Sequence, residues 1–112
     1  SAAGGEAVKG KFGEGVSVED GQKAARLCAL AIMAQVDALV GSLDKVTRIV
    51  KLGGFVACSP DFDQHPAIIN GASDLMVDVF GDAGKHARFA VGVPSLPLGF
   101  AVEIDAVVEV AD

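Results

Sequence analysis

Positive charge is scarce in this sequence, and its lysine and arginine residues do not cluster. The chain of 112 residues has 9 Lys and Arg against 15 Asp and Glu, which gives a formal net charge of −6. The phosphate backbone of a nucleic acid is repelled by such a surface, whereas proteins that bind nucleic acids normally carry a basic patch. The composition therefore disfavours a nucleic-acid partner.

An apolar run long enough to span a bilayer is also missing. Residues 27–36 are mostly apolar but fall short of the roughly 20 that a membrane helix needs, and residues 89–102 are interrupted by Pro94 and Pro97. Neither a membrane segment nor a signal peptide is predicted, and the chain is expected in the cytoplasm. With 51% hydrophobic residues and a mean hydropathy of +0.45, the domain should have part of its surface covered by copies of itself.

Cysteine and histidine are too few and too scattered to form a familiar metal or nucleophile motif. Cys28 and Cys58 have no CxxC spacing, and neither has ligand spacing with His65 or His86. We interpret the cysteines as small core residues in a reducing compartment, with a disulfide or metal role as the alternative. A Cys58–His65 nucleophile–base pair is disfavoured, because turn chemistry and solvation explain both residues. The glycine-rich residues 1–15 match neither GxGxxG nor the P-loop, so no phosphate-binding loop is predicted.

Two helices can be located from their ends. Ser17 suits an N-cap and Gly41 a C-terminal stop, so we predict a helix over Val18–Val40. Pro66 fits the first turn of a second helix, whose apolar stripe ends near Gly81.

The remaining segments alternate like strands. One strand of about a dozen residues is expected within residues 45–58, with a bulge or bend at Gly53 and Gly54, and two more at 88–93 and 100–110. At most a short strand is expected near residues 7–12. This order, (β)αβαββ, predicts a single α+β domain over residues 1–112, with both helices packed on one face of a mixed β-sheet.

The strand at residues 88–93 has two different faces. Phe89 and every second residue after it form an apolar row, while Arg88, Ala90 and Gly92 point the other way. We assign the apolar row to the helices, which leaves Arg88 on the face without helices. That face should pack against other copies of the chain and enclose Arg88 in a cleft.

Arg88 needs a partner, because a charge buried alone costs several kcal/mol. If residues 88–93 and 100–105 form a hairpin around PSLPLG, Asp105 lies opposite Arg88 and Glu103 is a diagonal neighbour. The arginine is then either neutralised by a cross-strand ion pair or offered as a fork to a ligand carboxylate. The residues alone leave both interpretations open.

Four segments resemble the Rid (YjgF) family of reactive-intermediate deaminases, in particular a branch with the helix INGASDL. They are GVSVEDGQKAARLCALAIMAQV, VKLGGFV, DFDQHPAIINGASDL and, most specifically, HARFAVGVPSLPLGFAVEIDAVVEV. The likeness extends over nearly the whole chain from about Gly10. It implies a chorismate-mutase-like fold and a homotrimer whose ligand sites lie in clefts between subunits.

The resemblance also implies an activity and the residues that perform it. Members of the family hydrolyse small 2-imino and enamine acids, such as 2-aminoacrylate, to 2-keto acids and ammonia, and they need neither metal nor cofactor. Arg88 stands where the family binds the substrate carboxylate, Glu103 where a glutamate orients the hydrolytic water, and Asn70 where an asparagine lines the site. Ala90 and Gly92 share the strand face of Arg88 and are expected to line the substrate pocket as well.

The sequence departs from the family in two places. The family's N-terminal strands, with an aromatic residue near the site, have no counterpart, and the chain has no Tyr or Trp. The chain also does not begin with Met, so either the sequence is incomplete or the sheet lacks its leading hairpin. Ala90 replaces a cysteine found in many members.

Two other functions remain to be weighed. A non-catalytic trimer that binds small 2-keto or related carboxylic acids is the alternative to a deaminase. The ribonuclease activity sometimes attached to the family is disfavoured by the acidic surface and by the lack of a plausible His–His or His–Lys acid–base pair.

Overall fold

The computed structural model describes residues 8–112 of the chain. Two α-helices and three β-strands follow one another along it in the order αβαββ, joined by short loops and 3₁₀ turns. They are α1 (Val18–Val40), β1 (Val46–Ala57), α2 (His65–Phe80), β2 (Ala87–Val93) and β3 (Val102–Val110).

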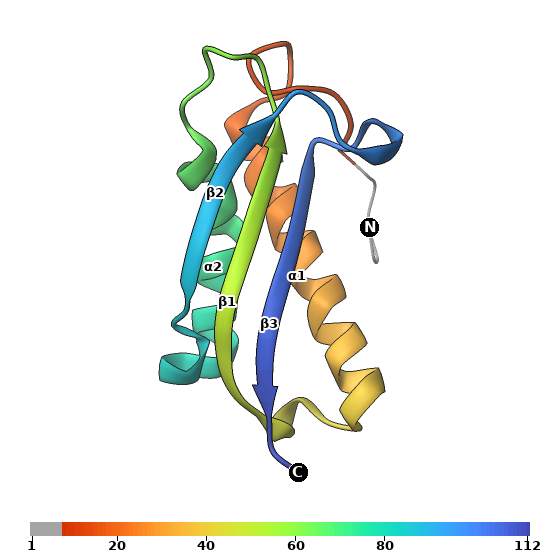
Figure 1. Ribbon diagram of the computed structural model, residues 1–112, viewed down its shortest axis with the longest axis vertical. Helices are drawn as coiled ribbons and strands as arrows, with labels where there is room; N and C mark the ends of the chain where they lie inside the picture. The colour runs from red at the N-terminus through yellow and green to blue at the C-terminus, as the bar shows by residue number, and fades with distance from the viewer. Residues whose placement is uncertain (1–7) are drawn as a thin grey trace.

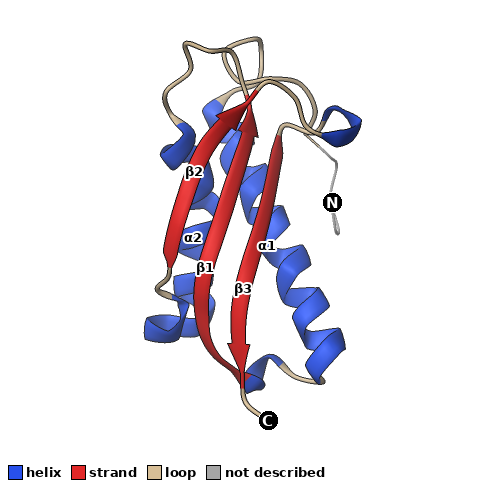
Figure 2. Cartoon of the chain, viewed as in Figure 1, coloured by secondary structure: helices blue, strands red, loops and turns tan. Residues whose placement is uncertain are grey.

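The strands form one mixed sheet in the order β2-β1-β3. The central strand β1 runs parallel to β2 and antiparallel to β3. Both helices cover the same face of this sheet and leave the other face bare, as Figures 1 and 2 show. The α+β architecture with helices on one side is therefore confirmed.

The ends of α1 lie where the sequence predicts them. The Ser17 side chain accepts a hydrogen bond of 3.1 Å from the backbone N–H of Asp20, which satisfies one of the free donors of the first turn. Gly41 ends the helix with φ +91°, a left-handed conformation that favours glycine. The helix spans Val18–Val40, as predicted.

The core fills the space between the helices and the covered face of the sheet. Gly54 of β1 faces α2 there, since a Cβ at this position would lie 2.5 Å from the Ile69 side chain. Of the bulge or bend predicted at Gly53 and Gly54, the bulge is wrong, because both residues pair regularly with β2 and β3. The irregularities lie earlier in β1, and the largest fully buried side chains are Phe12, Ile49, Leu52, Val56, Ile68, Ile69 and Met76.

The early bulges explain why β1 does not alternate cleanly. Its register with β3 shifts between Val46 and Arg48 and again between Ile49 and Lys51. Each shift changes which residues face the helices, so Ile49 and Leu52 are both buried although they are three residues apart, and Val50 between them is exposed.

The hairpin predicted between β2 and β3 is wrong. The two strands lie on opposite edges of the sheet, with β1 between them. The segment β1–α2–β2 forms a crossover, in which a helix carries the chain back so that the second strand runs parallel to the first. Asp105 consequently pairs with Gly53 of β1, and Arg88 with Leu52.

The face assigned to β2 is also wrong. Arg88 points toward α2, where it contacts Ser73. Phe89 lies on the bare face, where its ring packs edge-on against Phe55 at 5.3 Å between centroids and lies 5.2 Å from the Lys51 amine. The side of β2 that faces α2 therefore carries Ala90 and Gly92, which leave room for the helix, while the larger apolar side chains are on the bare face.

The short strand expected near residues 7–12 is reduced to isolated bridges. Lys9 pairs with Phe100, and Phe12 pairs with Val16 and Cys58. Residue 7 lies outside the described part of the chain. Among residues 8–112, no helix is both long enough and apolar enough to cross a bilayer.

Candidate functional site

Arg88 lies at the start of β2 and reaches across to α2. Its Nη1 donates to Ser73 Oγ at 3.1 Å, and its Nη2 donates to the Pro66 carbonyl oxygen at 3.4 Å. Both partners are neutral, and they lie two turns apart on one side of α2. The guanidinium is therefore held in place without being neutralised.

Ser73 is itself held by His86, the residue that precedes β2. The His86 ring places Nε2 at 2.9 Å from Ser73 Oγ and Nδ1 at 2.6 Å from the Gly84 carbonyl oxygen. Since a carbonyl oxygen can only accept, Nδ1 carries the proton, and when the ring is neutral Nε2 accepts from the Ser73 hydroxyl. The donors then run in one direction, from Arg88 to Ser73 to His86 to Gly84.

No carboxylate of the described residues neutralises Arg88. The ion pairs within residues 8–112 are Lys23–Glu19 and Lys85–Asp82. Of the two interpretations that the sequence left open, the cross-strand ion pair with Asp105 does not form within the chain, because Asp105 lies on the other edge strand and on the bare face beside Phe89. A guanidinium has five N–H donors, and two of those of Arg88 are engaged, which leaves capacity to hold a carboxylate.

Glu103 does not meet Arg88 within one chain. It lies on β3, is exposed, and pairs with Phe55 of β1. Alternation along β3 puts Glu103 on the bare face with Asp105, whereas Arg88 is on the covered face of the opposite edge. The sheet thus separates the two residues that sequence reasoning placed in one site.

The other expected site residues lie on the Arg88 side of the sheet. Asn70 is exposed on α2, four residues after Pro66 and three before Ser73, so it shares their stripe of the helix. Ala90 and Gly92 continue along β2 on the same face as Arg88. Arg88 and this stripe of α2 therefore lie together on one side of the sheet. Ser73 and His86 belong to the same group, and the sequence analysis had missed both.

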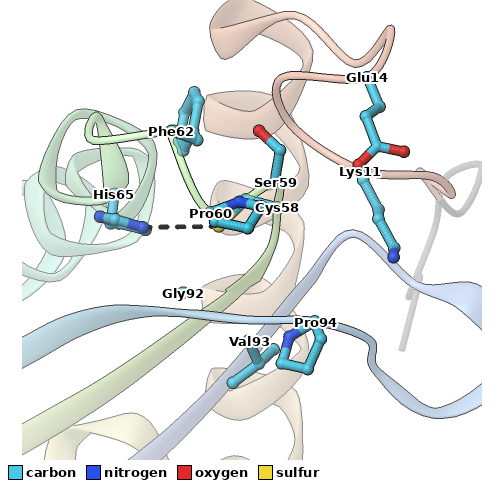
Figure 3. Close-up of a pocket in the computed structure, with 10 residues that line it drawn as sticks. All are labelled: Lys11, Glu14, Cys58, Ser59, Pro60, Phe62, His65, Gly92, Val93 and Pro94. Atoms are coloured by element: carbon cyan, nitrogen blue, oxygen red, sulfur yellow. Dashed lines mark hydrogen bonds between the residues drawn. The ribbon is translucent and has the colours of Figure 1, made fainter.

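A second group of residues lies farther along the same face of β2. It is the Cys58–His65 pair, which the sequence analysis disfavoured as a nucleophile and its base. Cys58 Sγ is 3.5 Å from His65 Nε2 at the wall of a cavity of about 400 Å³ that Gly92 also lines. Figure 3 shows this pair on one side of the cavity and Lys11 on the other. Gly92 is four residues beyond Arg88, about 13 Å along an extended strand, so this pocket is separate from the arginine.

The absence of a side chain at Gly92 makes the close contact possible. A Cβ there would lie 2.5 Å from Cys58 Sγ and 2.7 Å from His65 Nε2. Burial raises the pKa of the Cys58 thiol above its ordinary value, against smaller opposing effects of the Val93 backbone and Lys11. The thiol is therefore protonated at neutral pH and depends on a neighbouring base to become a nucleophile.

Comparison with known proteins identifies close relatives. The family described as "YjgF/chorismate mutase-like, putative endoribonuclease" matches residues 3–109. Protein TCP17 of Trypanosoma cruzi is 51% identical over 106 residues, which cover 94% of this chain and 66% of TCP17. The chain thus spans about two thirds of that relative's length.

Solved structures agree with the sequence match. Atu1372 of Agrobacterium tumefaciens, a protein of unknown function, has a TM-score of 0.92 and 51% identity, covering 97% of this chain and 71% of Atu1372. A Shewanella oneidensis protein described as a "putative endoribonuclease" has a TM-score of 0.88 and 31% identity, covering 92% of this chain and 68% of the Shewanella protein. Escherichia coli TdcF, solved with bound serine, has a TM-score of 0.55 and 26% identity, covering 81% and 65%.

Proposed function

The chain belongs to the YjgF/chorismate-mutase-like family, and on that premise we propose that it hydrolyses small 2-imino and enamine acids of the 2-aminoacrylate type. The products are the 2-keto acid and ammonia. The reaction takes place in the cytoplasm, in clefts between the subunits of a homotrimer. Arg88 binds the substrate carboxylate, Glu103 orients the attacking water, and Asn70 and Ala90 line the pocket. Gly92, which was expected there as well, lines the separate cavity beside Cys58.

One observation carries this proposal: Arg88 is held by neutral groups and lacks a carboxylate partner among residues 8–112. A half-buried guanidinium in that state favours an anionic ligand, and its planar fork matches a carboxylate. The serine bound to TdcF is likewise a small molecule that carries a carboxylate.

The separation of Arg88 and Glu103 supports sites between subunits. Because the two lie on opposite faces and edges of the sheet, a shared substrate requires Glu103 from another copy of the chain. The bare face also has the apolar character of an interface, because it carries the Phe55–Phe89 pair, and Val91 and Val107 are exposed there at 42% and 55%. Assembly through this face is part of the proposal.

The chemistry asks little of the protein. An imine carbon is already electrophilic, and imines hydrolyse in water unaided. Fixing the carboxylate and aligning one water therefore supplies most of what is needed, through orientation and general-base assistance.

The test measures how fast the protein removes an imine. An amino-acid oxidase generates the imine, and semicarbazide traps whatever remains. We expect Arg88→Lys to fail as completely as Arg88→Ala, because a point charge does not reproduce the bidentate fork. Imine removal at the wild-type rate in both variants would reject the role of Arg88.

A second candidate is a trimer that binds small 2-keto or related carboxylic acids without catalysis. Within residues 8–112, the Arg88 side chain donates hydrogen bonds to Ser73 and to the Pro66 carbonyl, which orient it. Neither group adds a general acid or base, so these contacts account for the binding of an acid without requiring catalysis. Glu103→Gln separates the two functions, since it should abolish turnover in an enzyme and leave binding of 2-ketobutyrate nearly intact in a sensor. The ribonuclease activity in the family's description fits poorly with a net charge of −6.

A further inference from the structure

The Cys58–His65 pair has a geometry that the proposed deaminase does not use. A thiol sulfur 3.5 Å from an imidazole nitrogen is placed for transfer of the thiol proton, which is the arrangement of a nucleophile with its general base. The pair borders a cavity of about 400 Å³, within the range of about 300–1,000 Å³ typical of small-molecule sites. We propose that Cys58 and His65 form a nucleophilic site that takes small α,β-unsaturated carbonyl compounds by addition at sulfur.

The lining of the cavity favours that class of compound. Phe62 and Pro94 supply apolar walls, while Lys11 and Glu14 contribute one charge of each sign. Since these charges offset each other, the pocket suits a neutral molecule with one polar end more than an acid. Lys11 lies across the cavity from the thiol in Figure 3, so its ammonium can stabilise the oxygen of a carbonyl whose far end meets Cys58.

The addition is balanced without any co-reactant. His65 Nε2 takes the thiol proton as Sγ bonds to the β-carbon, and the electrons of the C=C bond move toward the carbonyl oxygen. The imidazolium then returns the proton to the α-carbon, and the product is a thioether in which nothing has been oxidised or reduced.

A metal site and an ordinary core hydrogen bond both fit the pair less well. A metal site would need further ligands, and within residues 8–112 no group of three or more His, Cys, Asp or Glu side chains could hold an ion. A simple S–H···N hydrogen bond in the core would not need a cavity, yet this pair borders one while Cys58 itself is only 9% exposed. A nucleophile beside its base accounts for both the contact and the cavity.

The chain contains its own reference thiol. Cys28 on α1 is also free and is more exposed than Cys58, and in the described part of the chain it has no hydrogen bond to a histidine. Native protein is treated with acrylamide, a minimal α,β-unsaturated carbonyl compound, and the adduct at each cysteine is followed by peptide mass spectrometry. We expect Cys58 to react at least about tenfold faster than Cys28, although it is the more deeply buried thiol.

Two variants then test the base and the cavity. His65→Gln keeps a side chain of similar reach without the base and should slow the Cys58 reaction about a hundredfold. Gly92→Ala retains both reactive groups but places a Cβ against them, and it should slow Cys58 to a similar extent. In both variants Cys28 should react as in the wild type, which shows that the fold is intact.

The opposite results would overturn the proposal. If Cys58 in the wild type reacts no faster than Cys28, the pair is not a nucleophilic site. If His65→Gln keeps the wild-type rate at Cys58, the imidazole is not its base. If a substitution accelerates acrylamide addition at Cys58 and Cys28 by the same factor, it has loosened the fold as a whole.

Discussion

At the scale of the residue, the direction of the hydrogen bonds around Arg88 determines what this arginine can do. The Ser73 hydroxyl donates a hydrogen bond to His86, and its oxygen is then oriented to accept one from the guanidinium. The Gly84 carbonyl determines this direction, because it requires the proton on His86 Nδ1. Arg88 is thus positioned by neutral groups, and its charge stays available to a ligand.

This arrangement predicts the effect of removing one hydroxyl. Ser73→Ala deletes the acceptor of Arg88 Nη1 and leaves the charge in place. A typical hydrogen bond contributes about 1 kcal/mol, so we expect the Kd for 2-ketobutyrate, measured by calorimetry, to rise about fivefold. Ser95→Ala, in an exposed loop, is the matched control and should bind as the wild type does. Equal affinities in the two variants would mean that Ser73 does not position Arg88.

The two thiols give stability a dependence on alkaline pH. Burial raises the pKa of both Cys28 and Cys58 above the ordinary value of 9.0. The folded chain therefore keeps these protons to a higher pH than the unfolded chain. The corresponding stabilisation is complete below the unfolded pKa and is lost as pH rises through the folded one.

We therefore expect the free energy of unfolding to decrease above about pH 9, as measured by urea titration. Cys58→Ala should show a smaller decrease over the same pH range, and the variant with both cysteines replaced a smaller one still. A slope unchanged by the double substitution would assign the loss of stability to other groups.

At the scale of the element, the sequence was sufficient for the helices and insufficient for the strand faces. A helix end depends on a few neighbouring residues, so Ser17 and Gly41 were enough to locate both ends of α1. The face of a strand depends on what packs against it. In β2 the apolar row of Phe89 and Val91 lies on the bare face, and alternation along a strand does not tell whether an apolar row packs against a helix or against another copy of the chain.

The pairing of β2 could have been predicted. A helix between two strands of one sheet is a crossover connection, which normally joins parallel neighbours, whereas the short PSLPLG segment suggested a hairpin. The wrong pairing placed Arg88 next to Asp105 and hid its contacts with α2. The residues assigned to the ligand site kept their strands and helix, but Arg88 and Glu103 were not recognised as lying on opposite faces.

The crossing of the two helices gives a prediction of its own at Gly71. Replacing a glycine by alanine inside a helix normally stabilises by about 1 kcal/mol. Here a Cβ would collide with the backbone carbonyl of Gln22 on α1, which cannot move without shifting that helix. We expect Gly71→Ala to lower the free energy of unfolding by about 1–3 kcal/mol in denaturant titrations.

Asp74→Ala is the control for Gly71→Ala. It lies on the same helix, is exposed, and should leave stability unchanged or slightly higher. A stabilised Gly71→Ala protein would show that the helices can separate at this crossing without cost.

At the scale of the whole molecule, the sheet separates the two residues of the proposed site, Arg88 and Glu103. Arg88 is reached from the helix side of one edge, and Glu103 from the bare side of the other. Assembly through the bare face can bring the Glu103 of one copy toward the Arg88 edge of the next. In a closed ring each cleft would then take one residue from each of two neighbours.

Mixing two inactive variants tests this sharing of the site directly. Arg88→Ala and Glu103→Gln subunits are each expected to be inactive, and they are unfolded together in equal amounts and refolded. In a random mixed trimer a cleft is intact when an unaltered Arg88 meets an unaltered Glu103 from its neighbour, which occurs in about one quarter of clefts. Imine removal should therefore recover to about one quarter of the wild-type rate per subunit. If both residues of a cleft came from the same chain, no intact cleft could form and the mixture would stay as inactive as its parts.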